Sequence, residues 1–216
     1  MNPGSTRTRK FLTSDRSVAN VRAMQRGDEA RLALIDAALQ EASRIGLAGV
    51  TLAPVAQRAG WSKGGLLRHF PTKESLQLAV VHRASELFRE RVLLPSLSAP
   101  SGGPRLREIF HRWLAFVVKT GYEGGCPLNA ARLEFDDQPG EVRDAVASAW
   151  REWLQYLERL AAKALEQKEI RAELSPRQVA MLIVGLVGAC DNAMRLLDDR
   201  TAVRDAERAF EALFNH

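Results

Sequence analysis

The polar residues whose types and spacing could do chemistry are concentrated in one short segment of the sequence. Thr51 and Ser62 each stand where a helix is expected to begin. A hydroxyl there can cap backbone N–H groups, and the same groups suit a phosphate oxygen. Lys63 follows directly, and its ammonium group can donate to guanine O6 or N7. Gly64 and Gly65 would let base edges come close, so this chemistry is recognition of duplex DNA.

No residues form a catalytic pattern. The sequence has no HExxH, no GxxxxGK[ST] and no GxGxxG motif. His111 and Cys126 could in principle meet, but no motif spacing brings them together. Cys126 and Cys190 are far apart and in no metal-binding spacing, so we expect them to be buried small hydrophobic residues. We therefore expect no enzyme activity, no catalytic residue, no cofactor and no metal site.

Two short helices must position the residues that are expected to contact DNA. Thr51 can start the first helix, with Pro54 in its first turn, where a missing N–H costs nothing. Gly60 ends it and supplies the positive φ of a tight turn. Ser62 then starts a second helix that runs through His69. A short core of Val55, Ala59, Trp61 and Leu66 is expected between them. Preceded by an amphipathic helix, this pattern predicts a helix-turn-helix.

Residues 30–76 resemble the DNA-binding domain of the TetR family of bacterial transcriptional regulators. The residues that carry the resemblance are Gly49-Val50-Thr51-Leu52, Val55-Ala56, Ala59-Gly60-Trp61-Ser62-Lys63-Gly64, Leu66, His69-Phe70-Pro71 and Lys73-Glu74. Leu67 stands where the family usually has an aromatic residue that packs against the DNA backbone. The resemblance implies a C-terminal domain that binds a ligand and dimerises.

The resemblance and the helix-turn-helix pattern together give a set of DNA-contacting residues. We predict contacts from Thr51, Ser62, Lys63, Gly64, Gly65, Leu67, Arg68, His69 and Lys73. Thr51 and Ser62 can cap helices as well as touch phosphates. For Lys63 and Arg68 the alternative is a solvated surface position.

The rest of the chain predicts an all-α fold with about nine helices, because apolar residues recur at helical spacing and no strand alternation is present. Further helices are expected at 73–92, 105–120, 127–135, 141–167 and 176–197, followed by a last one containing Val203 and Phe210. Residues 95–104 are expected to form a loop. We predict a helix-turn-helix domain at 28–76 and a ligand-binding and dimerisation domain at 77–216.

Residues 1–27 are predicted to form a basic flexible arm. They carry six basic side chains against Asp15 alone, in a chain whose net charge is +5. This asymmetry indicates a polyanionic partner for the N-terminal half. The arm either binds phosphates or a neighbouring minor groove, or is disordered without a defined site.

The resemblance implies that the C-terminal helices surround a ligand cavity. Aromatic residues on apolar faces and polar residues inside apolar stretches are the candidates for contact. The predicted pocket consists of Phe110, His111, Trp113, Phe116, Val117, Asn129, Arg132, Trp150, Trp153, Val187, Asp191 and Met194. Asp191 follows an apolar run, so it belongs to an interface, to a pocket or to an ion pair with Arg195.

Small residues on the most apolar helix suit a tight contact between two subunits. The predicted dimer interface consists of Gly185, Gly188, Ala189, Val203, Ala206 and Phe210. Two helices from each subunit would form a four-helix bundle.

The helix-turn-helix pattern predicts a sequence-specific DNA-binding protein, and the resemblance implies a transcriptional regulator, a repressor released from its operator by a small and largely apolar ligand. The expected partners are double-stranded operator DNA, a second copy of the chain and a small-molecule effector. The alternative is a DNA-binding protein with a solid C-terminal core, regulated by a partner or not at all. The longest uncharged stretch, 178–190, is short for a membrane span, and no secretory signal precedes it. A cytoplasmic location without membrane contact is therefore expected.

Overall fold

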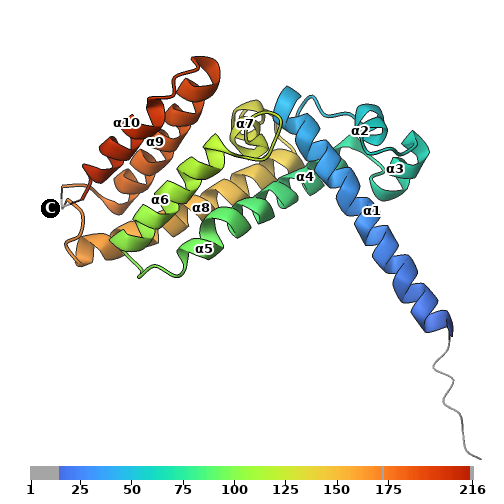
Figure 1. Ribbon diagram of the computed structural model, residues 1–216, viewed down its shortest axis with the longest axis horizontal. Coiled ribbons are helices and arrows are strands. Elements are labelled where there is room, and N and C mark those ends of the chain that lie inside the picture. Colours follow the sequence, from blue (N-terminus) through green and yellow to red (C-terminus); the bar gives the residue numbers. More distant parts are fainter. Residues whose placement is uncertain (1–14, 172, 215–216) are drawn as a thin grey trace, which may run out of the picture.

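The structure is a computed structural model that describes residues 15–171 and 173–214, with side chains from residue 24 onward. This part of the chain is all-α and contains no strand of a sheet (Figure 1). Its helices are α1 (Asp15–Ile45), α2 (Leu52–Arg58), α3 (Lys63–His69), α4 (Lys73–Phe88), the π-helix η1 (Arg89–Leu93), α5 (Leu94–Ser96), α6 (Gly103–Val118), α7 (Pro127–Glu134), α8 (Glu141–Glu166), α9 (Pro176–Leu196) and α10 (Ala202–Glu211). The predicted fold class is thereby confirmed.

Hydroxyl caps fix three helix starts that the sequence predicts. Ser62 accepts a 3.1 Å hydrogen bond from the N–H of Gly65 at the start of α3. Thr72 accepts one of 3.0 Å from Ser75 at the start of α4, and Ser175 accepts one of 3.2 Å from Gln178 at the start of α9. The latter two helices have full capping boxes, which satisfy two otherwise unpaired donors at each helix end.

The N-terminal helix corrects the predicted arm. α1 begins at Asp15, so residues 15–27 are helical and the expected flexible arm is wrong there. Residues 1–14 of that prediction lie outside the described residues. The segment contains Ala, Arg, Met and Gln, which favour a helix without any apolar period. In Figure 1 this part of α1 extends away from the other helices.

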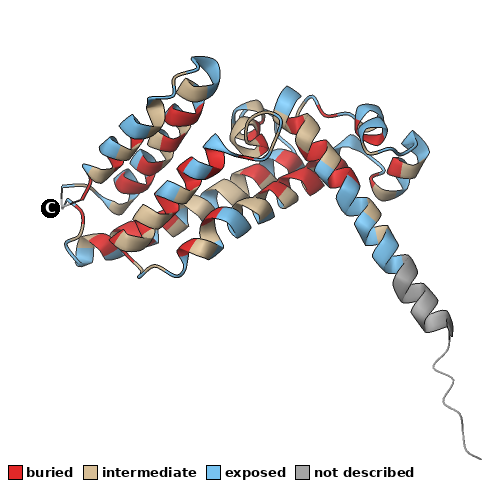
Figure 2. Cartoon of the chain, viewed as in Figure 1, coloured by how far each residue is buried: buried red, intermediate tan, exposed pale blue. Residues whose placement is uncertain are grey.

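Two clusters of buried residues hold the protein together (Figure 2). One joins α1 to the helix-turn-helix, with Leu34, Val55, Leu66 and Phe70 as fully enclosed members. It also includes Ala131 of α7, so the DNA-directed helices and the C-terminal helices share a core. The other cluster fills the C-terminal domain between α6, α8, α9 and α10. The two domains are therefore packed together and not joined by a free linker.

One expected core residue of the helix-turn-helix lies elsewhere. Trp61 is 37% exposed, and its ring packs edge-on to His69 at 5.8 Å between centroids. Val55 and Leu66 close the gap between α2 and α3 without it. The indole is too large for the space between two helices of seven residues each.

Candidate functional site

The predicted recognition helix, α3, presents its first turns to solvent. Lys63, Gly64, Leu67 and Arg68 are exposed, while Leu66 on the opposite side is fully buried. A Cβ added at Gly64 would meet nothing within 4 Å, so the space in front of this residue is open. At Gly65 a Cβ would lie 3.0 Å from the Trp61 ring. α3 is thus packed against the protein on the side of Leu66 and open to solvent on the opposite side. A helix that reads the major groove needs such an open side.

The other predicted DNA-contacting residues differ in how free they are. Thr51 precedes α2, is exposed, and its hydroxyl makes no capping hydrogen bond. Its hydroxyl is thus left for another partner. The ammonium of Lys73 donates to the backbone carbonyl of Ala48, which holds it against the turn between α1 and α2. His69 packs against Trp61. Contact with DNA stays a prediction for all nine residues.

A cavity of about 470 Å³ lies in the C-terminal domain between α4, α6, α7, α8 and α9. Five of the 21 residues that line it are aromatic. Phe88, Trp113 and Trp153 meet edge to face, with ring centroids 4.9–5.5 Å apart. Ligand pockets in proteins span about 300–1,000 Å³ and are mostly apolar. The C-terminal domain is therefore hollow, which disfavours the alternative of a solid core.

Seven of the predicted pocket residues line this cavity. They are Trp113, Val117, Asn129, Arg132, Trp150, Trp153 and Val187. The sequence reasoning missed most of the remaining wall, which consists of Ser85, Phe88, Arg89, Leu93, Cys126, Leu128, Val146, Ala149, Glu152, Gln155, Tyr156, Arg159, Val184 and Gly188. Tyr156 was detectable, since it lies three residues after Trp153 and so shares its helix face.

Five predicted pocket residues lie outside the wall. Phe110 stacks on Phe210 with ring centroids 3.9 Å apart, in the core between α6 and α10. Phe116 is a buried neighbour of Phe88. His111 lies half-exposed beside Glu207 and Glu211, at 3.7 and 3.9 Å. These three predictions are wrong, because an apolar helix face does not reveal whether it meets a cavity or another helix.

The other two, Asp191 and Met194, lie behind the wall. Asp191 is buried and accepts 2.8 Å hydrogen bonds from Asn129 and from Arg195. Its ion pair with Arg195, one of the alternatives open for it, is therefore present. Asn129 in turn accepts from the guanidinium of Arg132, whose carbon lies 3.8 Å from the centre of the Trp150 ring. A polar chain thus runs from the cavity wall on α7 into α9.

The cysteines are only partly as predicted. Cys190 is buried, whereas Cys126 is half-buried and lines the cavity at the start of α7. Desolvation raises the pKa of both thiols, so both stay protonated at neutral pH. Within the described part of the chain, no three His, Cys, Asp or Glu side chains come together in a way that could hold a metal ion.

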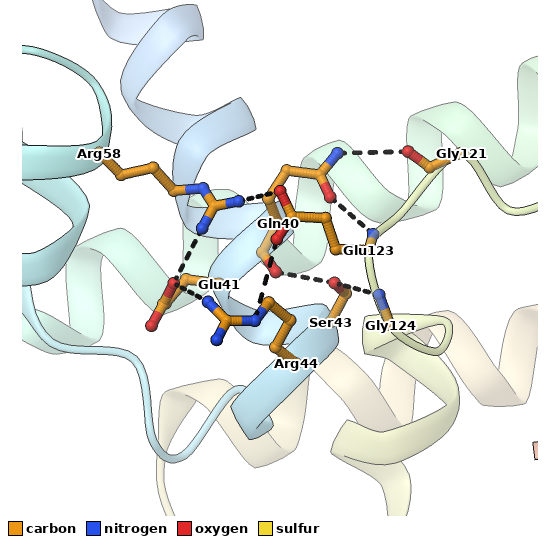
Figure 3. A network of polar contacts seen from close by, with 8 residues as sticks. All are labelled: Gln40, Glu41, Ser43, Arg44, Arg58, Gly121, Glu123 and Gly124. Carbon is orange, nitrogen blue, oxygen red and sulfur yellow. Dashed lines mark hydrogen bonds and ion pairs between the residues drawn. The ribbon is translucent and has the colours of Figure 1, made fainter.

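The loop between α6 and α7 is bonded to the DNA-directed domain (Figure 3). Glu123 pairs with Arg58 of α2, and the N–H of Gly125 donates to the Ser43 carbonyl at 3.1 Å. The hydroxyl of Ser43 accepts from Gly124, and the side chain of Gln40 bonds both Glu123 and Gly121. The same loop leads into α7, which lines the cavity, so the cavity wall and α1 are physically connected.

The predicted dimer interface is partly wrong. Ala206 and Phe210 are buried inside the protomer, and Val203 packs against the same core. Gly185 and Ala189 are exposed as expected, whereas Gly188 is half-buried and lines the cavity. The two exposed residues continue a stripe on α9 that includes Met181, 59% exposed, and Leu182, 41% exposed.

α9 is also long and apolar enough to cross a membrane by length and composition, with a mean hydropathy of 1.5. A third of that stretch is buried inside the protein, and a single helix of this kind is weak evidence for a membrane span.

An exposed helix-turn-helix joined to a hollow helical domain is the architecture of a transcriptional regulator. Residues 34–80 match the family model for bacterial regulatory proteins of the tetR family, and residues 102–210 match the tetracyclin repressor-like C-terminal domain. The chain belongs to the TetR family of transcriptional regulators. No curated protein sequence matches it.

Solved structures share the fold. A TetR transcriptional regulator from Chloroflexus aurantiacus J-10-FL is 27% identical, with a TM-score of 0.75 over 86% of this chain and 94% of that one. A TetR-family regulator from Cytophaga hutchinsonii is 20% identical, with a TM-score of 0.74 over 87% and 94%. AibR, solved in complex with isovaleryl coenzyme A and operator DNA, is 22% identical, with a TM-score of 0.72 over 86% and 98%.

Proposed function

We propose that the protein is a dimeric, cytoplasmic repressor that leaves its operator when a small molecule fills the cavity. The observation that carries the proposal is the double role of α7. Its residues Asn129 and Arg132 line the cavity, while its last residue, Glu134, accepts a 2.7 Å hydrogen bond from the backbone of Ala48, just before α2. A ligand that displaces α7 therefore acts directly on the helix-turn-helix.

The contacts on the other side of α7 support the same route. The loop at 121–125 bonds α1 and α2 through Ser43 and Arg58. α4, which follows the helix-turn-helix directly, contributes Ser85 and Phe88 to the cavity wall. A ligand that prefers a different position of α4 and α7 would change the distance between two recognition helices. These must lie about 34–36 Å apart to read successive major grooves. The ligand weakens operator binding only by its preference for the second state.

A second copy of the chain supplies the other recognition helix. The exposed stripe on α9, with Met181, Leu182, Gly185 and Ala189, is apolar and free of bulky residues at its centre. An added Cβ atom at the exposed Gly185 would meet nothing within 4 Å, so another helix can approach there. We infer that α9 packs against its counterpart in a two-fold dimer. AibR, bound to both a ligand and DNA, is a fold relative in which both partners occur together.

The N-terminal part of α1 is also expected to contribute to DNA binding. Arg26 is exposed on the part of α1 that extends from the protein. We expect this segment to add phosphate contacts, each of which steepens the logarithmic salt dependence of binding by about 0.9.

The decisive experiment measures fluorescence anisotropy of labelled DNA with the full chain at several salt concentrations. The probe is the DNA upstream of the protein's own gene, compared with a shuffled duplex of equal length. The expected result is binding that is at least about a thousandfold tighter to the upstream DNA. Equal binding to both duplexes at moderate salt would contradict the proposal. A variant with Lys63→Ala should lose the difference, whereas Lys163→Ala on α8, far from α3, should retain it.

A further inference from the structure

The cavity wall contains one half-buried guanidinium, that of Arg132, without an acidic partner among the described residues. Arg132 is half-buried in the wall, and among the described residues no carboxylate oxygen lies within 4.0 Å of it. Its contacts are the amide oxygen of Asn129 and the face of Trp150. Burial lowers the pKa of the Arg132 guanidinium, yet a guanidinium stays charged at neutral pH. The wall thus holds a positive charge that nothing in it neutralises directly.

The nearest acid is already balanced by another residue. Asp191 reaches Arg132 only through Asn129, and its other carboxylate oxygen is bonded to Arg195 at 2.8 Å. The single carboxylate of Asp191 therefore serves two guanidinium groups. It bonds Arg195 directly and is linked to Arg132 through Asn129. Partly buried charges are stable in proteins when they are paired. A negative group arriving in the cavity would complete the pairing of Arg132.

The remaining polar groups of the cavity also favour a ligand that carries a negative charge or a hydrogen-bond acceptor. The exposed rim carries Arg89 and Arg159 against the single acid Glu152, which gives an excess of positive charge. Within the wall, the indole N–H of Trp153 and the hydroxyl of Tyr156 are buried without a hydrogen-bond partner among the described residues. An indole N–H can only donate, so it needs an acceptor.

The apolar part of the wall defines the rest of the ligand. Trp113, Trp150 and Trp153 enclose the space with flat faces and edges. Such walls favour a planar or compact hydrocarbon body of a size that fits about 470 Å³. Arg132 is the one half-buried cation of the wall, while Arg89 and Arg159 are exposed to solvent. A group with a single negative charge balances Arg132, whereas a phosphate monoester carries nearly two charges at pH 7.

We propose that the cavity binds a monocarboxylate with an aromatic or compact apolar body, held by Arg132 through its planar guanidinium. A carboxylate matches two parallel N–H groups of arginine, which gives both energy and orientation. The body of the ligand lies among the tryptophans, and the Trp153 N–H turns to an acceptor oxygen. This assignment rests on the proposed ligand-responsive function and names the class of ligand.

Tryptophan fluorescence tests the assignment in the absence of DNA. Three of the four tryptophans line the cavity. The substitution Trp61→Phe removes the fourth and leaves the cavity wall unchanged. The probes are 4-phenylbutyrate and 3-phenylpropionate, each with its primary amide, and phenyl phosphate. The carboxylates should quench the fluorescence at millimolar concentration or below, and each amide should bind at least about tenfold more weakly.

Arg132→Gln should remove the difference between acid and amide, and Arg151→Gln, which removes an exposed charge of α8 outside the wall, should preserve it. Equal binding of acids and amides, tighter binding of phenyl phosphate, or no binding of any carboxylate would each overturn the proposal. Binding of a carboxylate without any change in operator affinity would instead leave the ligand class intact and contradict ligand-controlled release.

Discussion

The carboxylate Oε2 of Glu134, at the end of α7, accepts a 2.7 Å hydrogen bond from the backbone N–H of Ala48 in the turn between α1 and α2. The same side chain fills the space beside Gly46, whose φ of +80° ends α1. Ala48 also accepts a hydrogen bond from Lys73 at its carbonyl. One residue of the C-terminal domain thus holds the turn that leads into the helix-turn-helix.

Replacing Glu134 by alanine should loosen that turn. A hydrogen bond to a charged group contributes about 1.5–3 kcal/mol, so Glu134→Ala should lower the free energy of unfolding by about that amount. Hydrogen exchange of the Ala48 amide should become faster, which separates a local effect from a global one. Glu166→Ala, an exposed acid at the far end of α8, is the matched control. An unchanged exchange rate at Ala48 would contradict the role of Glu134.

Gly124 should tolerate no side chain. Its missing Cβ position overlaps the backbone carbonyl of Ser43, which cannot move without displacing α1. We expect Gly124→Ala to destabilise the protein by about 1–3 kcal/mol, in the range of overpacking substitutions. Gly27→Ala is the comparison, because nothing lies within 4 Å of the added atom and alanine favours a helix by about 1 kcal/mol.

Thermal unfolding should show a lower Tm for Gly124→Ala and a higher Tm for Gly27→Ala, because only the first substitution disturbs the contact between the loop and α1. A Gly124→Ala protein as stable as the parent would show that the loop can withdraw from Ser43 at no cost.

The sequence predicts local features of this fold better than contacts between helices. The caps at Ser62, Thr72 and Ser175 were predictable, because capping depends on residues only three apart. The helices that pack against each apolar face were not predictable. Phe110 was expected in a pocket and Phe210 in a dimer interface, yet the two rings stack on each other. Helical periodicity marks a buried face without saying what buries it.

The residues that line the cavity were also only partly predictable from the sequence. Trp113, Trp150 and Trp153 were correctly expected to gather, since they share apolar faces of α6 and α8. Phe88 was missed because its neighbours in the wall come from helices distant in the sequence. The contact of Gly124 with α1 and that of Glu134 with the turn after α1 also depend on the tertiary fold, and no pattern in the sequence marks them.

Gly64 should matter for DNA binding and not for stability. The space in front of it is open in the free protein, so Gly64→Leu creates no internal clash and adds a better helix former. The added side chain would occupy the place of a base edge. We expect an unchanged or higher Tm and at least about a tenfold loss in affinity for the upstream DNA, measured by anisotropy. Retained affinity would place this turn of α3 away from the groove.

The exposed stripe on α9 should control the oligomeric state. Met181→Asp places a charge at the N-terminal end of this stripe, where a partner helix would have to desolvate it. We expect the variant to elute as a monomer in size-exclusion chromatography with light scattering and to lose operator binding. Leu133→Asp is the matched control, because Leu133 is 74% exposed on α7 and lies outside the stripe. A dimeric Met181→Asp protein would move the interface to another face.

Tyr122 gives the protein a distinct response to alkaline pH. Its hydroxyl is buried without a partner among the described residues, and desolvation raises the pKa of Tyr122 to about 12 from its ordinary value of 10.0. Below pH 10 the side chain is neutral in both the folded and the unfolded chain. Between pH 10 and 12 only the unfolded chain ionises, so this residue makes stability fall as pH rises through that window.

Tyr122→Phe removes the titrating hydroxyl and keeps the ring packed against Phe116. Because an unpaired buried hydroxyl carries a desolvation cost of about 1–3 kcal/mol, the variant should be as stable as the parent or more stable at pH 7. Urea unfolding at several pH values should show a gap between the two proteins that widens above pH 10. A constant gap would mean that the hydroxyl reaches solvent or a partner in the folded state, and a narrowing gap would reverse the sign of the linkage.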